Sequence, residues 1–191
     1  MTETKKVTYA GIYLALSIIL VSIQIPLLPG NGIAIDLALV PIIIGRRHIG
    51  NQYALIISSI YPWVTLAGYM GGMLPGVLTL ILISYMFIVT DYLFAKIMHN
   101  SENLPKKYIF SKMWIWHYFA ALTISLILLI FNLFLFWPMY LEGLYDGWLP
   151  PNIFDGYFGL IFAITMGTTI IRYCAVYLVI SLIYPKIYHY L

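Results

Sequence analysis

Long apolar runs occupy most of this chain, and they limit the folds that it can adopt. A helix that crosses the hydrocarbon core of a bilayer needs about 20 mainly apolar residues. Of the 191 residues 62% are hydrophobic and only 9% are charged, which leaves too little polar surface to cover a water-soluble globule. The sequence therefore predicts an all-α membrane protein surrounded by a lipid bilayer. Its long apolar runs are residues 7–25, 53–70, 73–98, 114–140 and 157–184.

A sixth apolar stretch, residues 33–45, is short and contains Asp36 and Pro41. It is either a short or tilted span or a re-entrant segment. If it spans, nine of the ten basic residues fall on one side of the membrane, as the positive-inside rule expects of the cytoplasmic side. A re-entrant segment would place the later basic loop on the wrong side. We therefore predict one domain, 1–191, that is a six-transmembrane-helix bundle with both termini cytoplasmic. The nine residues are Lys5, Lys6, Arg46, Arg47, Lys96, Lys106, Lys107, Lys112 and Lys186.

Several function classes find no support in the sequence. It contains no GxxxxGK[ST] phosphate loop, no GxSxG elbow and no HExxH zinc motif, and its four histidines do not cluster. The spans offer one clear acid, one cation and no nucleophile paired with a base, so we predict no catalytic residue and no metal site. The net charge of +3 comes from the predicted cytoplasmic loops, which does not indicate nucleic-acid binding.

Arg172 is the strongest single signal, because it lies within a predicted span. A charged side chain at the centre of a membrane helix costs about 2.5–3.5 kcal/mol and persists where it is paired or faces a cavity. Thr165, Thr168, Thr169 and Arg172 stand at i, i+3, i+4 and i+7, which predicts one polar face directed inward. Arg172 either pairs with Asp36 to fix the fold or contributes to a substrate or ion site, and the two interpretations are compatible.

Asn132 lies within the fifth predicted span, roughly 12 Å from its outer end at 1.5 Å per residue. Its amide either binds a polar ligand or forms a hydrogen bond between helices. Its depth agrees with that of Arg172 and Asp36, which favours a pocket. The predicted substrate-binding residues are Asp36, Asn132, Thr165, Thr169 and Arg172.

Two other patterns have a functional and a plain interpretation. The outer connections combine glycine with proline, so Leu28, Gly30, Gly71 and Gly72 either belong to gating loops or form simple turns. In the first span, the small residues Gly11, Ala15 and Ser22 fall on one stripe. Another helix can approach closely along such a stripe, either inside the bundle or from a partner subunit.

The chain resembles the substrate-binding (S) component of energy-coupling factor (ECF) vitamin transporters, and most closely the riboflavin type. The similarity extends over most of the chain. It rests on Ile25-Pro26-Leu27-Leu28-Pro29-Gly30, on residues 35–45, on Phe131-Asn132 with Pro138-Met139-Tyr140, on the position of Arg172, and on the Gly11-xxx-Ala15 step.

The resemblance implies a subunit in a bacterial plasma membrane that binds a small water-soluble vitamin near its outer face. It would dock through its first span on a membrane coupling (T) subunit with two cytoplasmic ATPases, which bind the ATP, so no cofactor is expected on this chain. Asn132 matches the asparagine that contacts the flavin, and Arg172 falls where riboflavin-type members carry lysine or glutamine.

The chain departs from the riboflavin type at Thr169, where an asparagine is expected, and at Ser58 and Ser59, where a basic residue is frequent. Riboflavin is therefore the first expectation, with pantothenate, pyridoxine and hydroxymethylpyrimidine, the thiamine pyrimidine, as alternatives. Two hypotheses from other classes are a non-transporting membrane scaffold and a stand-alone carrier.

Overall fold

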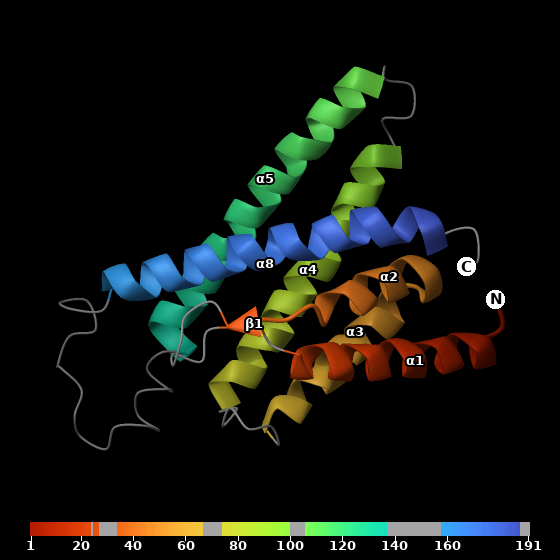
Figure 1. Ribbon diagram of the computed structural model, residues 1–191, viewed down its shortest axis with the longest axis horizontal. Helices are drawn as coiled ribbons and strands as arrows, with labels where there is room; N and C mark the ends of the chain where they lie inside the picture. The colour runs from red at the N-terminus through yellow and green to blue at the C-terminus, as the bar shows by residue number, and fades with distance from the viewer. Residues whose placement is uncertain (24, 27–33, 67–73, 100–105, 137–157, 188–191) are drawn as a thin grey trace.

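The computed structural model describes residues 1–23, 25–26, 34–66, 74–99, 106–136 and 158–187. These ranges form a helical bundle in which α-helices account for nearly all regular structure (Figure 1). A two-residue antiparallel pair, β1 (Ile25–Pro26) with β2 (Ala34–Ile35), links the first two helices. The α-helices are α1 (Glu3–Ser22), α2 (Leu39–Ile49), α3 (Asn51–Ile60), α4 (Leu74–His99), α5 (Lys106–Phe131) and α8 (Phe158–Ile187).

Four of these helices, α1, α4, α5 and α8, are long and apolar enough to cross a membrane. They carry many exposed large apolar side chains, such as Ile12, Leu126 and Leu182, which suit a lipid environment. The other two, α2 and α3, have 11 and 10 residues. At 1.5 Å per residue each is about half as long as the hydrocarbon core is thick. That all six helices cross the membrane stays a prediction.

The second predicted span, 33–45, is helical only in its later part. Helix α2 begins at Leu39 and continues to Ile49. The Asp36 carboxylate accepts a hydrogen bond from the Ala38 N–H at 3.0 Å, which stabilises the turn before the helix. Pro41 stands in the first helical turn, where its missing N–H costs no intrahelical bond. Only Gly50 separates α2 from the next helix, which starts at Asn51, and its φ of 102° suits glycine.

The third predicted span, 53–70, changes its winding in the middle. Its α-helical part, α3, ends at Ile60 and continues as the 3₁₀-helix η1 (Tyr61–Leu66). Pro62 has no N–H for an α-helical hydrogen bond, which explains why the α-helix ends here. The fifth helix changes in a similar way, because α5 is followed by the π-helical turn η2 (Asn132–Phe136).

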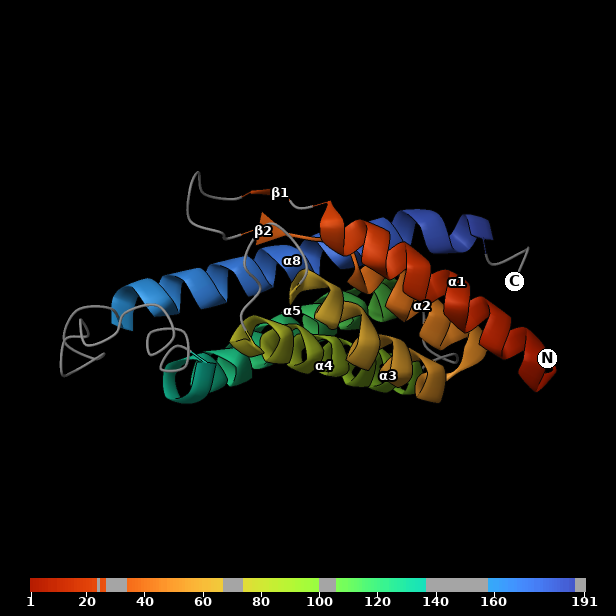
Figure 2. The ribbon, with the colours of Figure 1, turned by 90° about the horizontal axis from the view of Figure 1, so that it is seen from below.

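Helix α2 lies at the centre of the bundle, in contact with α1, α3, α4 and α8. Most of its residues are buried. Figure 2 shows α1 and α8 on one side of the bundle and α3 and α4 on the other. The start of α1 and the end of α8 lie at the same end of the bundle, near the junction of α2 with α3 (Figures 1 and 2). Helix α2 thus leads from the buried Asp36 towards this end of the bundle.

Candidate functional site

Arg172 of α8 forms an ion pair with Asp36, which precedes α2. The distance from Arg172 Nη2 to Asp36 Oδ2 is 3.0 Å, and the side chains are 15% and 5% exposed. The other carboxylate oxygen, Oδ1, accepts the hydrogen bond from the Ala38 N–H. The structure therefore forms the pair that the sequence offered as one interpretation of Arg172. Both oxygens of Asp36 have a partner, one on α8 and one at the start of α2.

The threonine face of α8 is directed inward at Thr165 and Thr169, each 4% exposed. The Asn132 amide donates a hydrogen bond to Thr165 Oγ1 at 3.0 Å and so joins η2 to α8. Thr168 is half-buried, and its hydroxyl donates to the Thr165 carbonyl at 3.4 Å. Thr165 and Arg172 are seven residues apart, or roughly 10 Å along the helix. Four of the five predicted residues thus form two contacts on α8, the Arg172–Asp36 ion pair and the hydrogen bond from Asn132 to Thr165.

Tyr61 is a buried polar residue beside the ion pair that the sequence analysis did not identify. Its side chain is fully buried, and its hydroxyl lies 2.8 Å from Ser84 Oγ of α4. It interacts electrostatically with both Asp36 and Arg172. Its position after the α3 helix, next to Pro62, was the available signal, because an aromatic hydroxyl there needs a buried partner.

The remaining predicted residues fall in two groups. The gating residues Leu28, Gly30, Gly71 and Gly72 lie outside the described residues. The stripe of small residues on α1 is described, and Gly11, Ala15 and Ser22 are exposed. A Cβ added at Gly11 would meet nothing within 4 Å. The stripe is therefore a surface of this chain, as docking on a partner requires.

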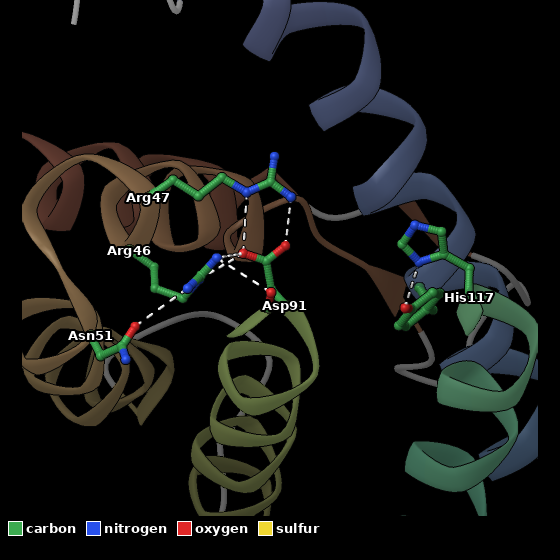
Figure 3. Close-up of polar contacts among 6 residues, drawn as sticks. Arg46, Arg47, Asn51, Asp91 and His117 are labelled. Carbon is green, nitrogen blue, oxygen red and sulfur yellow. Dashed lines mark hydrogen bonds and ion pairs between the residues drawn. The ribbon is translucent and has the colours of Figure 1, made fainter. Parts of the chain in front are cut away.

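A second cluster of charges joins the end of α2 to α4. Asp91 of α4 is fully buried and accepts hydrogen bonds from two guanidinium groups (Figure 3). Arg46 Nε donates to Asp91 Oδ2 at 2.6 Å, and its Nη2 forms an ion pair with the same oxygen. Arg47 donates from Nη2 to Oδ1 at 2.5 Å and from Nε to Oδ2 at 3.1 Å. Arg46 also donates to Asn51 Oδ1 at 3.4 Å, which ties the cluster to α3.

This cluster corrects two expectations from the sequence. Arg46 and Arg47 were assigned to a cytoplasmic loop, but they belong to α2, and Arg46 is buried. The prediction of one clear acid in the spans is wrong, because Asp91 also lies within an apolar run, residues 73–98. The rule that drew attention to Arg172, that a charge within a span needs a partner, applies equally to Asp91.

His117 of α5 lies apart from the charge cluster (Figure 3). Its Nδ1 is 2.9 Å from the Tyr173 hydroxyl of α8, and its ring also contacts the rings of Phe94 and Tyr177. These contacts pack α4, α5 and α8 together. Within the described ranges, no three His, Cys, Asp or Glu side chains form a group that could hold a metal ion.

The chain resembles a known protein in its fold. No family model and no curated protein sequence matches the chain. A solved structure, reported as the structure and mechanism of the S component of a bacterial ECF transporter, matches with a TM-score of 0.72. The match covers 99% of this chain and 98% of the other, at 19% sequence identity. The chain is therefore a membrane protein with the fold of an ECF transporter S component.

Proposed function

We propose that this protein is the substrate-binding S component of an ECF-type vitamin importer in the plasma membrane of a bacterium. The observation that carries the proposal is the match to an S component over nearly the full length of both chains. In this function, all six helices cross the membrane and both termini are cytoplasmic. The placement of the basic residues supports this topology, and so does the position of the start of α1 and the end of α8 at one end of the bundle.

The proposed vitamin site is on the inward face of α8 and the segments that meet it. Arg172 and Asp36 contribute an ion pair, while Asn132, Thr165 and Thr169 contribute uncharged polar groups. A few placed polar groups among mainly apolar side chains are typical of small-molecule sites. Riboflavin is the first candidate, with pantothenate, pyridoxine and hydroxymethylpyrimidine as alternatives.

The proposed partners are a membrane coupling (T) subunit and two cytoplasmic ATPases, because the chain has no nucleotide-binding motif of its own. We propose that the T subunit docks on α1, along the exposed stripe of Gly11, Ala15 and Ser22. Small side chains there would let a partner helix approach closely. Hydrolysis of ATP by the partners would then drive release of the vitamin inside.

The test is purification of the chain in mild detergent, followed by mass spectrometry of any ligand that it carries. A titration of the stripped protein with vitamins then gives the affinities. We expect one vitamin to bind tightly to the isolated chain, and ATPase subunits to co-purify from the native host. A chain that binds no vitamin and retains no ATPase would contradict the proposal.

The second candidate is a membrane scaffold, because both described charge clusters are satisfied within the chain. Arg172 pairs with Asp36, and Arg46 and Arg47 pair with Asp91. A scaffold would bind no vitamin and would lose only stability when these pairs are broken. A stand-alone carrier would instead move substrate across proteoliposomes without ATP.

A further inference from the structure

The ion pair in the proposed vitamin site restricts the charge of the ligand. This reasoning rests on the proposed function and adds the chemical class of the substrate. Asp36 is 4% exposed, and both of its carboxylate oxygens are used. One accepts the N–H at the start of α2, and the other accepts Arg172 at 3.0 Å. Asp36 is therefore committed to the fold and to balancing the charge of Arg172.

The other predicted polar groups of the site carry no charge. Asn132 and Thr165 form a neutral hydrogen bond, and Thr169 contributes a hydroxyl. The remaining charged side chains in the described ranges lie elsewhere. The Arg46, Arg47 and Asp91 cluster is at the other end of α2, roughly 15 Å away. The other charged residues of the described ranges lie in the sequence near the ends of α1, α4, α5 and α8: Glu3, Lys5, Lys6, Lys96, Lys106, Lys107, Lys112 and Lys186.

A charged ligand would unbalance the charge of this buried site. An anion that binds Arg172 beside Asp36 leaves one negative charge in excess, and one that displaces Asp36 leaves a buried carboxylate without this counter-ion. A cation at Asp36 leaves one positive charge in excess. By analogy with a buried ion pair that loses one partner, such an imbalance would weaken the binding of a charged ligand by roughly two to three and a half powers of ten. A neutral ligand can bind beside the intact ion pair, which has no net charge, and its affinity is not reduced in this way.

We infer that the substrate of this site carries no net charge, and that the Asp36–Arg172 pair stays intact when it binds. The site then excludes the phosphate esters and carboxylates of otherwise similar molecules. Among the candidates, riboflavin, pyridoxine and hydroxymethylpyrimidine fit, because they are neutral overall at neutral pH. Pantothenate does not fit, because it carries a carboxylate.

The experiment compares ligands that differ in one charged group. The purified, ligand-stripped protein is titrated with riboflavin and riboflavin phosphate, with pyridoxine and pyridoxine phosphate, with hydroxymethylpyrimidine and its phosphate, and with pantothenol and pantothenate. Tryptophan fluorescence reports binding. In the pair that contains the ligand, we expect the neutral member to bind at least 100-fold more tightly than the anionic one. Equal or tighter binding of the anionic member overturns the inference and leaves the proposed function intact. Absence of binding to every compound overturns the proposed function, and the inference with it.

Two variants test the role of the ion pair. Asp36→Asn keeps an oxygen for the Ala38 N–H but leaves Arg172 without its carboxylate, so we expect the preference for the neutral member to fall at least tenfold. An unchanged preference in a folded Asp36→Asn protein overturns the inference. Glu3→Gln makes the same chemical change at an exposed acid and should leave the preference unaltered.

If Asp36→Asn does not fold, the double variant Asp36→Asn/Arg172→Gln replaces it. Because this variant removes both charges and leaves the site neutral, it should still prefer the neutral member by at least tenfold. Preference of the double variant for the anionic member would contradict the inference. Size-exclusion chromatography in detergent shows which variants are folded.

Discussion

Replacement of Asp91 by asparagine tests whether the charge cluster holds α2 against α4. The change keeps the shape of the side chain but removes the negative charge that faces Arg46 and Arg47. The side chain of Arg46 is only 7% exposed, so water cannot solvate its guanidinium in place of Asp91. The side chain of Arg47 is 20% exposed. Breaking a buried pair in this way costs about 3–5 kcal/mol. Each 1.4 kcal/mol is tenfold in an equilibrium constant, so we expect the folding constant to fall by roughly two to three and a half powers of ten.

The measurement is unfolding of the detergent-solubilised protein by a titration with sodium dodecyl sulfate, followed by circular dichroism. Glu3→Gln is the matched control, because it changes an acid to its amide in the exposed ion pair of Glu3 with Lys6. Exposed pairs contribute little to stability, so this variant should unfold like the parent. The double variant Asp91→Leu/Arg46→Met removes the carboxylate together with the buried guanidinium. It should recover most of the loss, because apolar groups of similar volume can replace a buried pair.

The reasoning would be refuted by an Asp91→Asn protein that unfolds at the same midpoint as Glu3→Gln. It would also be refuted if the double variant were less stable than Asp91→Asn alone. In that case, the shape of the two side chains would matter more than the balance of charge.

Three further predictions concern single residues. In Gly45→Ala the new Cβ would lie 3.0 Å from the Tyr13 ring, so we expect a loss of about 1–3 kcal/mol in the same unfolding assay, whereas Gly11→Ala, with open space, should be neutral. Asn132→Ala removes the hydrogen bond to Thr165 and should weaken vitamin binding two- to tenfold in a titration without changing the preference for neutral ligands. Burial lowers the pKa of His48, at the end of α2, below its ordinary value of 6.5. The unfolded chain then binds a proton at His48 more readily than the folded chain, so the folded state loses stability as the pH drops below about 6.5. Thermal unfolding measured between about pH 7.5 and 5.5 should show a smaller fall in the midpoint temperature for His48→Gln than for the parent protein.

The sequence predicted the helical class and the approximate positions of the long helices, because apolar length is a property of each segment alone. It was less successful for the second segment, where the helix starts at Leu39 and extends through Arg46 and Arg47. A span that is predicted from hydropathy ends at the first charged residues. The helix continues past them because Asp91, 45 residues beyond Arg46, supplies the counter-charge. A prediction made from each segment alone cannot take account of a partner that is so distant in the sequence.

For the candidate site, the sequence identified Arg172 from the cost of burying its charge and Asp36 from its matching depth. The structure brings these two together and also joins Asn132 to Thr165. The place of Tyr61 next to Pro62 was a signal in the sequence, but only the structure shows that its hydroxyl is buried against Ser84 of α4. The roles of these residues in binding stay predictions.

The order of synthesis gives the two arginines of α2 different tasks at different times. In the proposed topology α2 crosses the membrane. Arg46 and Arg47 are synthesised 44 to 45 residues before Asp91, so in that topology α2 would insert with both of its positive charges unbalanced. Unbalanced arginines at the end of a helix direct its orientation during insertion. Asp91 of α4 would then neutralise one of the two charges and fix the orientation of α2. In the proposed topology, the same side chains would therefore act first as an insertion signal and afterwards as a contact between helices.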